Sequence, residues 1–90
     1  AQFAAMVSVQ ELAASGAYDG SAVVFIDGPG TVLTIGAVGS AGEVIKVKSK
    51  VAVGDVQIDG DIEGTLGNSV TLSDNGAVML VSDGSMWWIM

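Results

Sequence analysis

The sequence predicts a mainly β fold with short strands, arranged as a β-sandwich or a barrel-like sheet. From residue 21 on, short runs of Val, Ile, Leu and Thr alternate with Gly, Asp, Asn and Ser, as strands alternate with turns. In several runs every second residue is apolar, which places the apolar side chains on one face of a strand. Half of the 90 residues are apolar and only 14% are charged, so a chain this small is expected to leave apolar surface for another chain to cover.

Residues 1–20 differ from the rest of the chain and are expected to form an N-terminal arm or a short helix. The segment is rich in Ala, and Ser8 followed by Glu11 matches a helix capping box. A short helix near residues 9–15 is one prediction. An extended arm that lies on a neighbouring molecule is the other, because so short a helix is marginal alone in water.

The β-domain is expected to span residues 21–90, with strands wherever an apolar run lies between turn residues. We expect strands at residues 22–26, 31–35, 43–48, 55–58, 69–72, 77–82 and 85–89. We expect turns in the sequences DGPG, GAVGSAG, DGD, SDNG and SDGS, because their Gly, Asp and Asn residues tolerate turn conformations.

The stretch from residue 55 to residue 73 carries all of its large apolar side chains at even positions, across three glycines. A slip of one residue would move this row to the opposite face, so the glycines are interpreted as bends within an extended path. One strand cannot bury such a row alone, and a second sheet or further copies of the chain must cover it. The predicted β-core is Ile45, Val47, Val56, Ile58, Ile62, Leu66, Val70 and Leu72.

The last 14 residues, AVMLVSDGSMWWIM, lose the alternation and are apolar on both faces. A strand that is apolar on both faces is usually buried on both faces. Packing between subunits is the simplest way to achieve this at the end of a chain, and adjacent Trp residues suit an interface core. The predicted subunit interface is Val78, Leu80, Met86, Trp87, Trp88 and Ile89.

Three carboxylates, Asp59, Asp61 and Glu63, begin like a calcium-binding loop. The twelfth position of that loop would be Val70, which cannot bind a cation, and no helix is expected on either side. Alternate side chains of an extended strand also lie about 7 Å apart, too far to enclose one ion without a bend. A solvated strand face is therefore favoured over a metal site, and no cofactor is expected.

Composition excludes several functions. The net charge of −7 disfavours nucleic acid and anionic membranes as partners, since both attract basic surfaces. The chain has neither His nor Cys, which removes the commonest bases, nucleophiles and soft metal ligands, so we expect no enzymatic activity.

The segments TVLTIGAVGSAGEVIKVKSK and GNSVTLSDNGAVMLVSDGSMWWIM resemble a β-structured module of tailed-bacteriophage virion proteins, found in tail fibres, head fibres and capsid decoration proteins. The resemblance covers about residues 31–90. AGEVIKVK and LVSDGSMWWIM carry it, and the second of these, the ending, is its specific part, whereas the rest is a loose pattern. It implies an intertwined homotrimer, such as a trimeric β-prism with C-terminal trimerisation strands, exposed on a virion. Thr34 and Ser49 depart from the Pro and Asn that the family often carries there.

The expected function is that of a small trimeric decoration, or cement, protein on the capsid exterior, with the major capsid protein as its partner. Residues 1–20 would attach it. We expect a complete chain whose start is compatible with removal of an initiator Met before Ala1, with another cleavage as the alternative. The row Lys46, Lys48 and Lys50 is either a solvated face or a docking stripe for an acidic capsid surface. The alternatives are a receptor-binding fibre tip and a calcium-stabilised carbohydrate-binding module. The predicted attachment residues are Phe3, Met6, Val7, Val9 and Leu12.

Overall fold

The computed structural model describes residues 7–36 and 39–90, and within these ranges the chain forms nine strands and no helix. The strands are β1 (Val9–Leu12), β2 (Gly16–Ala17), β3 (Val23–Ile26), β4 (Val32–Gly36), β5 (Val44–Ser49), β6 (Asp55–Ile62), β7 (Thr65–Ser73), β8 (Ala77–Ser82) and β9 (Trp87–Ile89). These residues therefore include no helix that is long and apolar enough to cross a membrane.

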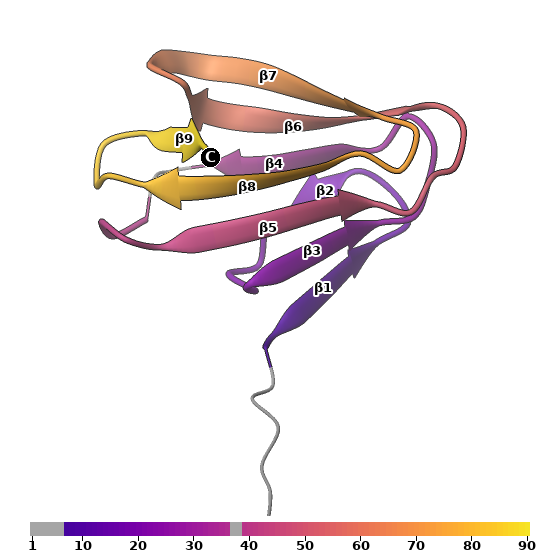
Figure 1. The fold of residues 1–90 in the computed structure, drawn as a ribbon, viewed down its shortest axis with the longest axis horizontal. Helices are drawn as coiled ribbons and strands as arrows, with labels where there is room; N and C mark the ends of the chain where they lie inside the picture. Colours follow the sequence, from indigo (N-terminus) through magenta and orange to yellow (C-terminus); the bar gives the residue numbers. More distant parts are fainter. Residues whose placement is uncertain (1–6, 37–38) are drawn as a thin grey trace, which may run out of the picture.

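All nine strands belong to one sheet, which curves into a nearly closed barrel (Figure 1). The strand order is β1-β3-β5-β8-β9-β6-β4-β2, and β7 pairs only with β6. Strands β1, β3 and β5 are parallel neighbours in one wall, and β2, β4 and β6 are parallel neighbours in the other. Strand β8 pairs antiparallel with β5, and β7 pairs antiparallel with β6. The short β9 lies between β8 and β6 and so joins the two walls. The prediction of a mainly β, barrel-like fold is confirmed.

The two ends of the strand order, β1 and β2, meet along a seam that the side chain of Gln10 bridges. The Gln10 amide nitrogen donates to the Ala17 carbonyl at 2.8 Å, and its amide oxygen accepts from the Asp19 N–H at 3.0 Å. A primary amide offers the same donor and acceptor as a peptide group, so Gln10 supplies the pair of bonds that a further strand would have made.

The barrel interior is filled by about every second side chain of its strands, because successive side chains of a strand point to opposite faces. Thirteen apolar residues form this core: Val24, Ile26, Leu33, Ile35, Ile45, Val47, Val51, Val56, Ile58, Ile62, Leu72, Leu80 and Trp87. The even-numbered row predicted in residues 55–73 is thus covered mainly by the opposite wall of the same chain. Val70 packs against the core from a half-buried position.

Leu66 is the exception, and its assignment to the core is wrong. It is 73% exposed, because the β6–β7 ladder shifts register and pairs the buried Ile62 with Thr65, which turns the next residue, Leu66, to the outer face. The even-numbered pattern of the sequence places Leu66 in the inward row, but the register shift, with Gly67 at positive φ, reverses the alternation at the start of β7.

The helix predicted near residues 9–15 is not formed, since Val9–Leu12 is strand β1. The Ser8 hydroxyl accepts from the Ala22 N–H at 2.9 Å instead of capping a helix, and the Ser8 carbonyl accepts from Val23 N at 3.1 Å. The segment therefore belongs to the sheet through its pairing with β3, and the local capping pattern loses to that long-range ladder.

The turn predicted in DGD is also wrong, because β6 continues through it with a bulge between Gly60 and Ile62. Gly60 is needed for close packing, since a Cβ there would lie 2.4 Å from Cγ1 of Ile35. The chain turns later, at Glu63 and Gly64, where φ is positive. Residues 37 and 38 of the turn predicted in GAVGSAG lie outside the described residues.

Candidate functional site

The carboxylates considered as calcium ligands serve three separate places in the structure. An Asp59 oxygen accepts from the Gln57 side-chain amide at 2.7 Å and from the Ser69 hydroxyl at 2.8 Å, which ties β6 to β7 on the outer surface. Asp61 accepts from the Gly67 N–H at 3.0 Å and so holds the end of the β6–β7 hairpin.

Glu63 fastens β9, because its carboxylate accepts from the Ile89 N–H at 2.8 Å. Within residues 7–36 and 39–90, no three His, Cys, Asp or Glu side chains gather closely enough to hold a metal ion. The geometry therefore assigns the acidic stretch to hydrogen bonds that shape one end of the barrel.

The predicted subunit-interface residues separate into an inner and an outer set. Leu80 is 0% exposed and Trp87 is 1% exposed in the single chain, so neither has surface to offer a partner, and the interface assignment is corrected for these two. Val78 and Met86 are half-buried, whereas Trp88 and Ile89 are exposed. Strands β8 and β9 are apolar on both faces, but only their inner face is buried in the barrel. Their outer face remains on the surface.

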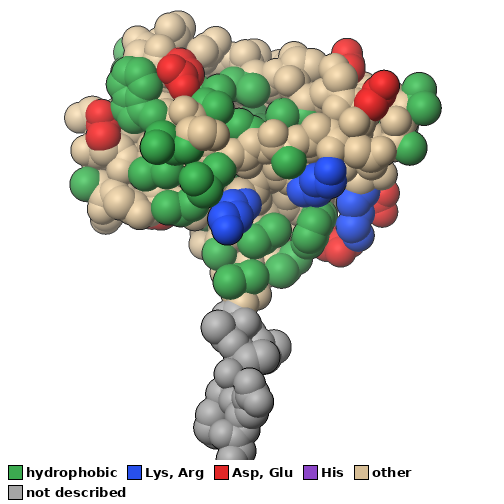
Figure 2. Space-filling model, viewed as in Figure 1, with side chains coloured by type: hydrophobic (Ala, Val, Ile, Leu, Met, Phe, Trp, Pro, Cys, Tyr) green, Lys and Arg blue, Asp and Glu red, His purple; other side chains and the backbone are tan. Residues whose placement is uncertain are grey.

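The outer surface of β3, β5, β8 and β9 remains apolar, and we call it the outer apolar face. Its side chains alternate with the buried ones in each strand and include no carboxylate. Figure 2 shows hydrophobic side chains gathered on this side of the molecule, with lysines among them. The apolar members of the face are Val23, Phe25, Val44, Ala77, Met79, Val81, Trp88 and Met90.

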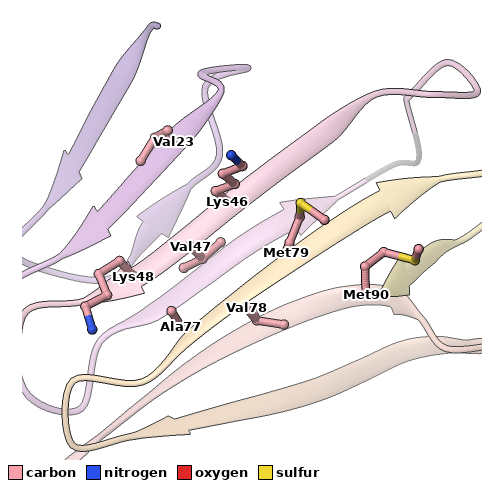
Figure 3. A pocket seen from close by; sticks show the side chains of 8 residues that line it. All are labelled: Val23, Lys46, Val47, Lys48, Ala77, Val78, Met79 and Met90. Atoms are coloured by element: carbon pink, nitrogen blue, oxygen red, sulfur yellow. The ribbon is translucent and has the colours of Figure 1, made fainter.

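A groove crosses this face where Val23, Lys46 and Met79 stand side by side on three neighbouring strands. It consists of two hollows of about 280 and 490 Å³, and these three residues line both. Figure 3 shows the first hollow, with Met79 on β8 next to the lysine-bearing strand β5 and Met90 on the other side of β8. We call the two hollows together the Lys46 groove.

The three lysines of the chain are bonded differently. Lys50 forms an ion pair with Glu11 at 3.2 Å and lies over the Phe25 ring, 5.2 Å from its centre. The Lys48 ammonium donates to the Asn75 carbonyl. The Lys46 ammonium group makes no hydrogen bond or ion pair with any other described residue, so the groove combines apolar walls with an available cation. Such a site suits an apolar segment that carries a carboxylate.

The N-terminal residues predicted to attach the protein are only partly described. Phe3 and Met6 lie outside the described residues. Val7 is 60% exposed and lines the groove, and Val9 is 48% exposed on β1. Leu12 packs against the core from its half-buried position and is part of the barrel.

The groove residues Val23, Val44 and Met79 were not predicted as functional. The signal was present in the alternation of residues 44–48, where Val44 shares a face with Lys46 and Lys48. Recognising the groove also requires the neighbours of that strand, and the long-range pairing of β5 with β3 and β8 supplies them.

Trp88 is held at the edge of the outer apolar face by Asp83. The indole N–H of Trp88 donates to one Asp83 oxygen at 2.8 Å, and the Met86 and Ser85 N–H groups donate to the other. The hydrogen bonds from Met86, Ser85 and Trp88, in that order of importance, lower the pKa of Asp83 below its ordinary value. The arrangement fixes both the turn before β9 and the orientation of the ring.

In comparisons with known proteins, no protein-family model matches the chain, and no curated protein or solved structure is significantly similar to it.

Proposed function

We propose that the protein is an adhesive structural subunit of a tailed-phage virion, a small trimeric decoration protein on the capsid exterior that binds the major capsid protein. The observation that carries the proposal is the outer apolar face, with Trp88 36%, Val44 37% and Met90 74% exposed on a chain that otherwise buries its core. Exposed apolar surface of this kind is typical of protein contact sites. The resemblance of residues 31–90 to virion modules supports the same function.

The adhesive mechanism needs no reaction. Burial of apolar surface between neighbours contributes about 25 cal/mol per Å², before the cost of association. A trimer would bind through three linked contacts, so its avidity would exceed that of one contact. The net charge of −7 would keep neighbouring particles apart.

Sedimentation with capsid shells of the encoding phage tests the proposal. The labelled protein should bind the shells saturably, in multiples of three copies, and raise the temperature at which they rupture. Light scattering on the free protein should report three times the 9.0 kDa chain mass. Shells that bind no protein at saturating concentration would refute the decoration function.

A receptor-binding fibre tip is the second candidate, and the exposed Trp88 ring favours it. An indole whose N–H is held by Asp83 presents a fixed face on which a sugar ring could stack. Titration with host-surface glycans should then quench tryptophan fluorescence, and Trp88→Phe should abolish the quenching. Melting with and without a chelator tests the calcium-stabilised module, for which the midpoint must fall when the metal is removed.

A further inference from the structure

We infer that the Lys46 groove of one copy binds the β6–β7 hairpin of a second copy, with Leu66 as the inserted side chain. The contact is therefore head-to-side, between two different surfaces of the same chain. This inference rests on the self-association contained in the proposed function, and it adds the surfaces and the mode of contact.

Charge segregation identifies a second copy as the occupant. The strands of the outer apolar face, β3, β5, β8 and β9, contain two lysines and no carboxylate. The strands β4, β6 and β7 contain three aspartates and no cation. One chain thus presents both halves of a complementary pair, and they lie on different parts of its surface.

The same charges disfavour a face-to-face dimer. In a two-fold contact between outer apolar faces, Lys46 and Lys48 of one copy would approach the same lysines of the other copy. Like charges brought together in a partly desolvated contact are unfavourable. The cationic face therefore selects the anionic part of its neighbour, which is a contact between unlike surfaces.

The end of the β6–β7 hairpin has the properties that the groove requires. Leu66 is 73% exposed, so a large apolar side chain lies on the surface and is largely uncovered by the described residues. The Asp61 carboxylate accepts from Gly67, the next residue, and Glu63 lies in the turn. Each uses one of its oxygens in the hydrogen bonds already described, and the other oxygen can meet Lys46.

In an open row of such contacts, the first copy keeps an unused groove or hairpin and the last copy keeps the other. The row therefore either closes into a ring or continues to grow. A ring of three copies satisfies every groove and every hairpin and agrees with the proposed trimer. A two-fold dimer formed face to face would leave each hairpin unused.

Two variants, each defective in one half, test the inference. Lys46→Glu reverses the charge of the groove but keeps the hairpin, and Leu66→Asp removes the apolar hairpin residue but keeps the groove. Each variant alone should elute at the 9.0 kDa mass of one chain, while the wild type elutes as an oligomer. Mixed in equal amounts, the two variants should form a complex of twice that mass, because one intact hairpin meets one intact groove.

Val53→Asp is the matched control, since Val53 is 83% exposed at the opposite end of the barrel and should leave the oligomer unchanged. Circular dichroism establishes that each variant is folded, and Val44→Asp serves as a second groove variant. Retention of the oligomer by both groove variants overturns the inference, as does a mixture that yields no complex.

The outcome is separable from that of the proposed function. If capsid shells bind the wild-type oligomer but not the single-chain variants, the result supports both the decoration function and the inferred contact. A protein that assembles as inferred yet binds no shell refutes only the decoration function. A wild type that keeps its oligomer without Leu66 refutes only the inferred contact when shell binding persists. A wild type that is a single chain refutes the inferred contact and the proposed trimer, while shell binding still tests the decoration function.

Discussion

Ile58 and Leu66 lie in the same even-numbered row of the sequence, but Ile58 is 0% exposed and Leu66 is 73% exposed. Ile58→Ala should lower the free energy of unfolding by about 2–5 kcal/mol, because it leaves a cavity in the barrel. Leu66→Ala should change it by no more than about 0.5 kcal/mol in dilute protein. Urea denaturation of both variants measures the difference, and equal losses would contradict the placement of Leu66 outside the core.

Asp83 should make the β8–β9 turn sensitive to acid. Its pKa lies below the ordinary value of 3.8, so the folded state is stabilised by the ionised form. That contribution is fully present above pH 3.8 and is lost as the pH falls through the lowered pKa. Asp83→Asn should therefore melt at a lower temperature than the wild type at neutral pH.

The difference in melting temperature between wild type and Asp83→Asn should shrink as the pH falls from 3.8 through the lowered pKa, at which the carboxylate of the folded protein becomes protonated. Asp27→Asn is the control, because Asp27 is exposed and its side chain makes no hydrogen bond with another described residue. A difference that is constant from neutral to acidic pH would show that the charge of Asp83 does not stabilise the turn.

At the scale of the element, β7 is an edge strand of the sheet, and its backbone groups alternate between paired and free. Gln57 N donates to Thr31 O, and Asp55 O accepts from Gly30 N. The backbone N–H and C=O groups of these odd residues of β6 therefore point towards β4 and the residues just before it. The backbone groups of the even residues of β6 therefore point towards β7, where Ile58 pairs with Val70. The N–H of Thr71, opposite Gln57, points away from the sheet.

Proline substitutions in β7 should distinguish these two positions. Val70→Pro removes a ladder hydrogen bond and should cost at least about 2 kcal/mol more than Thr71→Pro, whose lost N–H has no partner in the sheet. Alanine at each position corrects for the lost side chain. Chemical denaturation gives the four free energies, and equal costs for the two prolines would refute the assigned ladder.

At the scale of the whole molecule, the barrel is closed by a side chain where a strand pair is missing. Gln10→Ala should remove both seam bonds and cost about 1 kcal/mol, a modest figure because the bonds are exposed. The amide of Asp19 should also exchange with solvent faster. Hydrogen exchange measures this local effect, which distinguishes an opened seam from general destabilisation.

Two neighbouring changes serve as controls for the seam. Gln10→Glu keeps the acceptor for Asp19 N but loses the donor to Ala17, so Asp19 should stay protected. Glu11→Ala removes only an exposed ion pair with Lys50 and should have little effect on either measurement. Unchanged exchange at Asp19 in Gln10→Ala would show that the seam does not depend on this side chain.

Local sequence patterns predicted most of the fold but only a small part of the candidate site. The alternation in residues 43–48 and 55–58 correctly predicts the buried Ile45, Val47 and Val56, because it depends only on the geometry of an extended chain. The capping pattern at Ser8 is equally local, and it failed because the pairing with β3 outweighs it. The Lys46 groove could not be predicted, since its walls come from strands that are distant in the sequence.

By itself, the sequence determined that this protein is built from short strands and which side chains share a face of each strand. Those properties depend on neighbours one or two residues away. Only the tertiary structure decided which faces are covered: the order of strands buries Leu80 and Trp87 inside one chain, exposes Leu66, and leaves Lys46 in an apolar groove. Burial is a property of contacts between strands that are remote along the chain, and no local period encodes their order.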